Sequence, residues 1–218
     1  MELLEHVKLQ SSYFINSHVN FFIKRLFDIF LSITLILILS PLIIGIAYRL
    51  YKREGNPVFY KVPCFGKNKQ LFTLYSFRMK TRPRQLIESL PPHPKPEDWK
   101  YGVPNLFHFS RDDTIYTQTG IMLKKYYLYK LPQLFNVMKG DMSFVGPRPE
   151  DVVIVENYNR QQLNRLKVRP GITGYTQVNL PETSGYDDIV KGDLYYISQL
   201  SFFFDLKILY RSLPWKNV

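Results

Sequence analysis

Two arginines in this sequence are framed by prolines, and the arrangement suits the binding of an anion. Arg148 lies in Gly146-Pro147-Arg148-Pro149, and Arg169 precedes Pro170-Gly171. Because proline fixes one backbone dihedral, a framed arginine loses less freedom when its guanidinium binds a ligand. The planar guanidinium matches the oxygens of phosphate in particular. A loop arginine paired with a nearby carboxylate is the alternative explanation.

The net charge also favours an anionic partner. The 218 residues include 29 Lys and Arg against 18 Asp and Glu, a formal net charge of +11. The basic residues are scattered without a nucleic-acid-binding signature, so we expect anionic lipid or a phosphorylated substrate and no nucleic acid. The single cysteine, Cys64, excludes an internal disulfide and a thiolate metal cage, and the four histidines lack metal-ligand spacing.

One strongly apolar run, from Ile29 to Ala47, has basic residues on both sides. It is long enough to cross a bilayer as a straight helix. Ser40-Pro41 lies inside it, however, where proline removes a helix hydrogen bond and favours a kink. Positive flanks at both ends give no preferred direction of insertion. The pattern therefore favours a helix that enters one leaflet and returns; a simple bitopic span is the alternative.

Local patterns also predict the elements that must position the arginines. The aromatic-rich residues 57–80 contain a Gly66-Lys67-Asn68 turn and predict a β-hairpin. Apolar residues at helical spacing before Lys139-Gly140-Asp141 predict a helix with Pro132 near its first turn. Residues 152–166 form another helix candidate. Three of its side chains are expected to face outward: Tyr158, Gln162 and Arg165.

These elements predict a mixed α/β fold in a single compact domain with an N-terminal re-entrant membrane helix broken at Ser40-Pro41. We expect residues 1–20 to be an N-terminal lead and residues 21–52 to be the membrane helix. Residues 53–212 would form the cytoplasmic domain. Within it, residues 81–113 are Pro-rich and predict a surface loop.

Two long motifs carry a family resemblance. LPQLFNVMKGDMSFVGPRP at residues 131–149 and KVRPGITGYTQVN at residues 167–179 closely resemble the bacterial sugar transferases that work on polyprenyl phosphates. The resemblance to these monotopic phosphoglycosyl transferases runs from about Lys24 to about Leu209. It implies the re-entrant form of the membrane helix and a location on the cytoplasmic face of the bacterial inner (plasma) membrane.

The resemblance also implies an activity. Such enzymes move a phosphosugar from a nucleotide sugar to a lipid phosphate, with Mg²⁺ as cofactor. The step starts glycan assembly of the exopolysaccharide, capsule or lipopolysaccharide O-antigen type. The implied partners are membrane lipid, polyprenyl phosphate and a nucleotide sugar. A homo-oligomer, or a complex with a glycosyltransferase of the pathway, is also compatible with the resemblance.

The resemblance further assigns site residues. In the family, an Asp-Glu pair precedes Leu-Pro-Gln-Leu, and its aspartate attacks the diphosphate of the nucleotide sugar. Tyr129 and Lys130 occupy these two positions here. The resemblance makes Lys24 and Arg25 candidates for contact with the polyprenyl phosphate headgroup, with a membrane-surface anchor as the plainer alternative. The expected phosphate-binding residues are therefore Arg148, Arg169, Lys24 and Arg25.

The changed pair leaves two functions open. An ionised carboxylate is a competent nucleophile and a ligand for Mg²⁺, whereas a tyrosine is mostly protonated at neutral pH and a charged lysine cannot bind a metal. Asp141 is a remaining candidate metal ligand, although a turn or capping role explains it more simply. The chain is then either a sugar transferase in which Tyr129 replaces the nucleophile or a catalytically silent relative, a pseudoenzyme, that binds the ligands or a partner enzyme.

A second departure lies upstream of the pair. The family has an Asp-x-Arg-x-Thr-Arg-x-Gly pattern where this chain has residues 113–120. Ile115 and Gln118 replace its two arginines. Like the exchange at residues 129 and 130, this departure argues against the family's catalytic activity.

Overall fold

The structure of the chain is a computed structural model that describes residues 2–80, 99, 101–105, 116–181 and 183–213, with side chains from residue 21 onward. The predicted Pro-rich loop at 81–113 and the change at Ile115 lie largely outside these residues. The described part is a mixed α/β domain with a long apolar helix at its N-terminal end, which confirms the predicted fold class.

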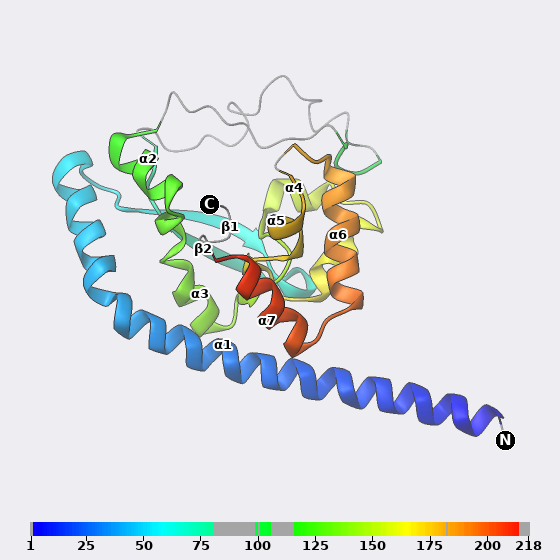
Figure 1. Ribbon diagram of the computed structural model, residues 1–218. Coiled ribbons are helices and arrows are strands. Elements are labelled where there is room, and N and C mark those ends of the chain that lie inside the picture. Colours follow the sequence, from blue (N-terminus) through cyan, green and yellow to red (C-terminus); the bar gives the residue numbers. More distant parts are fainter. Residues whose placement is uncertain (1, 81–98, 100, 106–115, 182, 214–218) are drawn as a thin grey trace.

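The long helix α1 (Glu2–Glu54) runs along one side of the domain (Figure 1). It begins ahead of the predicted boundary at residue 21, and the chain remains helical through Ser40 and Pro41. The ribbon nevertheless changes direction toward its C-terminal end, where the last turns rise beside α2. The path of α1 relative to a bilayer, and therefore the re-entrant form, stays a prediction.

The apolar surface of α1 is mostly exposed. Within the described residues, Phe21–Glu54 is the segment long and apolar enough to cross a membrane, and only 17% of its most apolar stretch is buried in the protein. Exposed side chains here include Phe22, Phe30, Leu37 and Ile44. Contact with lipid would remove this apolar surface from water.

The predicted hairpin is confirmed. Strands β1 (Phe59–Phe65) and β2 (Leu71–Phe77) pair in antiparallel fashion around the short 3₁₀ helix η1 (Lys67–Lys69). Strand β1 also pairs with β4 (Glu150–Asp151), so the sheet order is β2-β1-β4. This second pairing brings Glu150, which follows the Arg148 loop, beside Phe65 at the turn end of the hairpin.

A helical segment follows the gap in the described residues. Helix α2 (Gln118–Lys125) leads to the 3₁₀ helix η4 (Leu128–Lys130) and then to α3 (Gln133–Lys139). Pro132 is the N-cap of α3, where a missing N–H costs no helix hydrogen bond. Gly140 ends α3 at φ 101°, in the left-handed region that glycine tolerates. The predicted positions of this proline and this turn are therefore confirmed.

The remaining elements are a second, smaller sheet and the helices around it. Strands β3 (Ser143–Val145) and β5 (Gly171–Thr173) pair in parallel. The predicted continuous helix over residues 152–166 is wrong, because α4 ends at Glu156 and a separate 3₁₀ helix follows. The helices in chain order are α4 (Val152–Glu156), η5 (Gln162–Lys167), α5 (Tyr175–Asn179), α6 (Tyr186–Ser198) and α7 (Phe202–Arg211).

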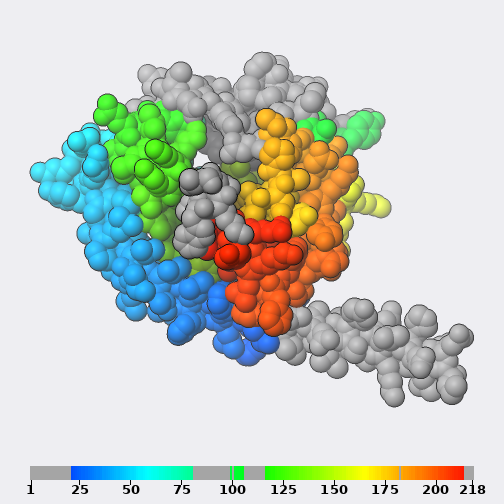
Figure 2. Space-filling model, in the orientation of Figure 1, coloured from blue at the N-terminus to red at the C-terminus, as the bar shows by residue number. Residues whose placement is uncertain are grey.

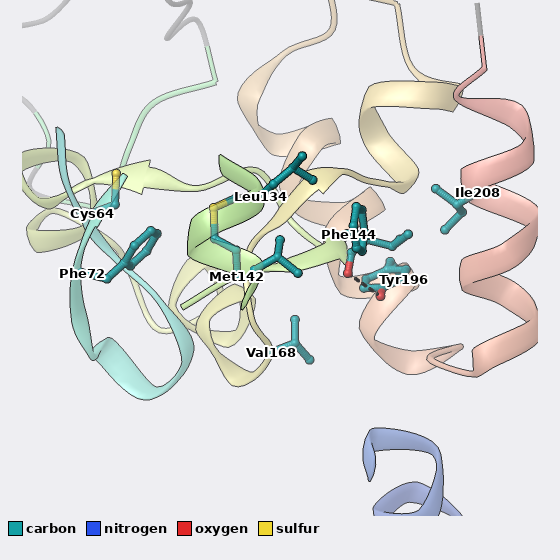
Figure 3. Packing of buried hydrophobic residues seen from close by; sticks show 10 residues of the cluster. Cys64, Phe72, Leu134, Met142, Phe144, Val168, Tyr196 and Ile208 are labelled. Atoms are coloured by element: carbon teal, nitrogen blue, oxygen red, sulfur yellow. Dashed lines mark hydrogen bonds between the residues drawn. The ribbon is translucent and has the colours of Figure 1, made fainter. Parts of the chain in front are cut away.

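One hydrophobic cluster joins the hairpin, α3, β3, α6 and α7 (Figure 3). Its buried members include Phe72, Leu134, Phe144, Tyr196 and Ile208. Burying side chains of this size stabilises the fold by roughly 1.5–3 kcal/mol each before the loss of conformational entropy is counted. Partly buried residues of α1 pack against the same cluster, and in Figure 2 the described part of α1 (blue) lies against α7 (red).

Candidate active site

Two charged residues at the start of the apolar run attach α1 to the domain. Lys24 is only 9% exposed; its ammonium group pairs with Asp205 on α7 and donates to the carbonyl oxygen of Val145 at 3.0 Å. Asp28 is 2% exposed and accepts a hydrogen bond from the Phe144 N–H at 3.1 Å. Buried charges persist only with such partners. Lys24 therefore has a structural role, and this geometry does not support its predicted contact with phosphate.

Arg25 and Arg169 both bind the C-terminal end of α3. Arg25 donates to the carbonyl oxygens of Val137 at 2.7 Å and Met138 at 3.1 Å, and Arg169 Nε donates to that of Gly140 at 2.7 Å. The last carbonyls of a helix lack partners within the helix and carry partial negative charge, so cations are favourable there. These arginines fix the α3 terminus between α1 and the start of β5.

A small pocket beside these arginines brings basic side chains together next to residues 21–28 of α1. Its lining residues are Phe21, Lys24, Arg25, Asp28, Lys67, Val168 and Arg169. Three of the four predicted phosphate-binding residues thus lie together, and Arg148 lies elsewhere. Lys67 was missed by the sequence reasoning, because it belongs to the hairpin turn and no local pattern connects it with α1.

The loop that carries Arg148 packs directly on the backbone of β5. Gly146 N–H donates to the Thr173 carbonyl at 3.0 Å, and Gly171 N–H donates to the Pro147 carbonyl at 2.8 Å. A Cβ atom at Gly146, Gly171 or Gly174 would overlap the facing backbone. The glycines of the two sequence motifs are therefore required by the same close contact, which holds the Arg148 loop in place.

Behind this loop, Arg165 forms the centre of a buried polar cluster. It is 2% exposed; its Nε donates to Asp193 at 2.8 Å, and its Nη1 donates to Glu150 at 3.2 Å and to the Tyr186 hydroxyl oxygen at 2.8 Å. Burial raises the pKa of Glu150 and Asp193, and the Arg165 charge opposes both shifts. Glu150 is therefore engaged in the fold and does not replace the missing carboxylate pair.

The expectation that three side chains of residues 152–166 face outward is wrong. Tyr158 and Arg165 lie in the buried cluster, and Gln162 accepts a hydrogen bond from the Val103 N–H at 3.1 Å. The helical periodicity that predicted exposure does not apply, because α4 and η5 are separate elements.

Tyr129 and Lys130 lie on η4, and the charge of Arg148 acts on both side chains. Lys130 Nζ donates to the Ile172 carbonyl at 2.8 Å, and burial together with the Arg148 charge lowers the pKa of Lys130 to about 8. Burial raises the pKa of Tyr129, and the Arg148 charge opposes this shift. The fold therefore brings together the three predicted site residues 129, 130 and 148.

Two further cations lie over the ring of Tyr116. Lys124 and Lys80 lie over the Tyr116 ring, with Nζ 4.4 Å and 5.1 Å from its centroid, and the charge on Lys124 also opposes the rise in the pKa of Tyr129. Sequence reasoning missed Tyr116 and Lys80, which the bridge between residues 80 and 116 brings together. We call the set Lys80, Lys124, Lys130 and Arg148 the cationic site.

The cationic site does not fit a magnesium ion. Mg²⁺ prefers charged oxygen ligands, whereas the positions of the family's carboxylate pair hold a phenol and an ammonium group. In the described part of the chain, no group of three or more His, Cys, Asp or Glu side chains could hold a metal. Asp141, the predicted carboxylate candidate, instead accepts a hydrogen bond from the Asn136 side chain at 3.2 Å beside the α3 terminus.

Comparison with known proteins gives consistent matches over nearly the whole chain. Residues 19–215 match the family model described as bacterial sugar transferase. The chain is 35% identical over 187 residues to the uncharacterized sugar transferase EpsL of Bacillus subtilis (strain 168), covering 86% of this chain and 83% of that protein. It is 32% identical over 194 residues to the exopolysaccharide production protein ExoY of Sinorhizobium fredii, covering 88% and 84%.

A longer relative matches as well. The undecaprenyl-phosphate galactose phosphotransferase of Salmonella typhimurium is 37% identical over 194 residues, covering 88% of this chain but 40% of that protein. The chain thus spans most of two of these relatives and about two fifths of the third.

Proposed function

Because the chain belongs to the bacterial sugar transferase family, we propose that it serves the transfer of a phosphosugar from a nucleotide sugar to polyprenyl phosphate. The observation that carries the proposal is the Arg148 loop, held on β5 by glycine contacts in the same domain that bears the long apolar helix α1. The name of the Salmonella relative supports the lipid phosphate and the sugar phosphate as ligands, and that of ExoY supports exopolysaccharide assembly. The glycan whose assembly the chain serves could equally be a capsule or a lipopolysaccharide under this proposal.

We place the polyprenyl phosphate headgroup at the basic pocket next to residues 21–28 of α1. Lys24 and Asp28 hold the start of the apolar run against α7 and β3, so lipid contacting α1 would reach the domain beside Arg25, Lys67 and Arg169. Clustered cations at a membrane surface attract anionic headgroups. Basic residues on both flanks of the apolar run favour a domain on the cytoplasmic face.

Transfer through this chain requires a nucleophile, and Tyr129 stands at its position. Its phenolate oxygen would attack the sugar-linked phosphorus, and the bond to the departing nucleoside monophosphate would break. An oxygen of polyprenyl phosphate would then displace the tyrosine and take the phosphosugar. Burial raises the pKa of Tyr129, however, so the phenol keeps its proton at neutral pH and the attack is disfavoured.

This observation favours a second candidate function, which is binding of the nucleotide sugar and lipid phosphate without transfer. In that case the chain would act beside a catalytic partner of the same pathway. Release of nucleoside monophosphate from a panel of nucleotide sugars, measured with polyprenyl phosphate present, distinguishes the two functions. Release by the wild type that is lost in Tyr129→Phe and kept in Tyr126→Phe, a change at an exposed tyrosine, establishes transfer through Tyr129.

Two other outcomes are informative. Binding of nucleotide sugar without any release supports the silent relative. Release that survives Tyr129→Phe places the nucleophile elsewhere, and Asp141→Asn is then the next variant.

A further inference from the structure

The two strands of the small sheet hold Lys130 and Arg148 on one side of the domain. Lys130 Nζ is fixed at 2.8 Å from the carbonyl oxygen of Ile172 on β5. Strand β3 runs parallel to β5 and leads into the Arg148 loop, which is hydrogen-bonded to both ends of β5 through Gly146 and Gly171. The Lys130 ammonium group and the backbone of the Arg148 loop are therefore both held by β5.

Lys130 is partly buried, and the like charge of the exposed Arg148 disfavours its protonated form. No carboxylate among the described residues forms a salt bridge with Lys130. Its ammonium group donates to the Ile172 carbonyl and lies over the Tyr127 ring, with Nζ 5.8 Å from the centroid.

We propose that Lys130 and Arg148 bind the diphosphate of a nucleotide sugar directly, with no divalent cation between protein and ligand. The identity of the ligand rests on the proposed function; the independence from metal rests on the side chains at the site. A bound diphosphate would replace the repulsion between the two cations by two attractions, with charge-assisted hydrogen bonds from both.

The side-chain cations would thereby screen the charge of the diphosphate, as a metal ion does in a site with carboxylates. Carboxylates hold Mg²⁺, and the ion then screens the negative charge of a diphosphate. At the cationic site the screening charge is part of the protein. Mg²⁺ would meet Lys124, Lys130 and Arg148 instead of carboxylates, so its binding is opposed by the groups that attract the diphosphate. The Tyr129 phenol adds a hydrogen-bond donor at the same place.

The experiment is equilibrium binding of UDP-galactose, UDP-glucose and inorganic pyrophosphate to the full chain in lipid nanodiscs, in EDTA and in Mg²⁺. We expect the Kd of the nucleotide sugar that binds to change less than about twofold between the two conditions. Lys130→Gln and Arg148→Gln are each expected to weaken binding by about tenfold or more, as befits loss of a charge-assisted hydrogen bond. Lys130→Arg, which keeps the charge, should retain most of the affinity.

Lys125→Gln is the matched control, because Lys125 is an exposed lysine five residues away that lies over the Tyr126 ring. Its Kd should equal that of the wild type, and thermal melting of each variant shows that it is folded. Binding only in Mg²⁺, or binding unaffected by Lys130→Gln, overturns the inference while the proposed function stands. Metal-independent, Lys130-dependent binding of pyrophosphate without binding of either UDP-sugar supports the site and counts against these sugars as ligands. Absence of binding by all three probes in both conditions overturns the inference.

Discussion

Lys24 and Asp205 form a buried ion pair that joins helix α1 to helix α7 across 181 residues of sequence. The carboxylate of Asp205 also accepts a hydrogen bond from the Tyr196 hydroxyl at 2.7 Å, and that hydroxyl reaches the Val145 carbonyl at 3.1 Å. The pair lies where the apolar run begins, so it sets the position of the membrane helix relative to the domain.

Loss of this pair should destabilise the protein strongly. Lys24→Ala leaves Asp205 buried without its cation, and we expect a loss of about 3–5 kcal/mol in the free energy of unfolding. Urea denaturation in detergent measures it, with Lys207→Ala as the control because Lys207 is an exposed residue of the same α7. The double variant Lys24→Met with Asp205→Leu should recover most of the loss, since it removes both charges. A loss below about 1 kcal/mol for Lys24→Ala would contradict a buried, structural pair.

The topology of α1 can be tested with tags. If the helix returns to the side from which it enters, a tag before Phe21 and a tag after Val218 are both reached by cytoplasmic probes only. Pro41→Leu removes the helix-bending residue, so a fraction of molecules should then adopt a spanning form. Ile44→Leu, an apolar exchange at an exposed position of the same helix, should leave the labelling unchanged. Periplasmic labelling of the wild-type N-terminal tag would establish a bitopic helix instead.

The glycine contact beneath Arg148 predicts a position-specific effect of added methyl groups. In Gly146→Ala, the Cβ overlaps the backbone of the 169–171 segment, so we expect a loss of about 1–3 kcal/mol in stability and weaker binding of nucleotide sugar. Gly45→Ala places its Cβ where no atom lies within 4 Å, and a helical alanine is more favourable than glycine by up to about 1 kcal/mol. Thermal melting and ligand binding of the two variants give the comparison. Equal effects at both positions would argue against a tight loop contact.

The lowered pKa of Lys130 predicts how stability depends on pH. In the folded chain, burial and the Arg148 charge lower it to about 8 from an ordinary value of 10.5, so the folded form releases this proton first. Between these two pH values the unfolded chain binds more protons, and stability therefore rises with pH. The stability of the wild type relative to Lys130→Gln should increase from pH 8 to pH 10, as measured by urea denaturation of both proteins. A difference that stays constant over this range would show that Lys130 is not buried beside Arg148.

A carboxylate pair at positions 129 and 130 should increase phosphosugar transfer. Tyr129→Asp combined with Lys130→Glu supplies a nucleophile and removes the ammonium charge that opposes Mg²⁺. We expect this double variant to release more nucleoside monophosphate than the wild type, with release that depends on added Mg²⁺. Ile115 and Gln118, which replace the arginines of the family pattern, would keep the rate low. A wild type that already turns over efficiently, and loses activity on the double change, would contradict the expectation.

Local sequence patterns were sufficient for elements whose determinants are neighbours in the chain. The hairpin around Gly66 and the limits of α3 at Pro132 and Gly140 are set by turn and cap residues within a few positions of the element. The long motifs around Arg148 and Arg169 were sufficient for the family, and they located the exchange at residues 129 and 130 because the positions on both sides agree with the family pattern.

The partners of the charged residues were decided only by the tertiary structure. Arg165 was expected at the surface, yet it is buried against Glu150 and Asp193, which lie 15 and 28 residues away. Lys24 and Arg25 are adjacent in sequence, but one pairs with α7 and the other binds the end of α3. A buried charge is stable only where several elements converge on it, and that convergence depends on contacts between residues far apart in the chain, which local periodicity does not contain.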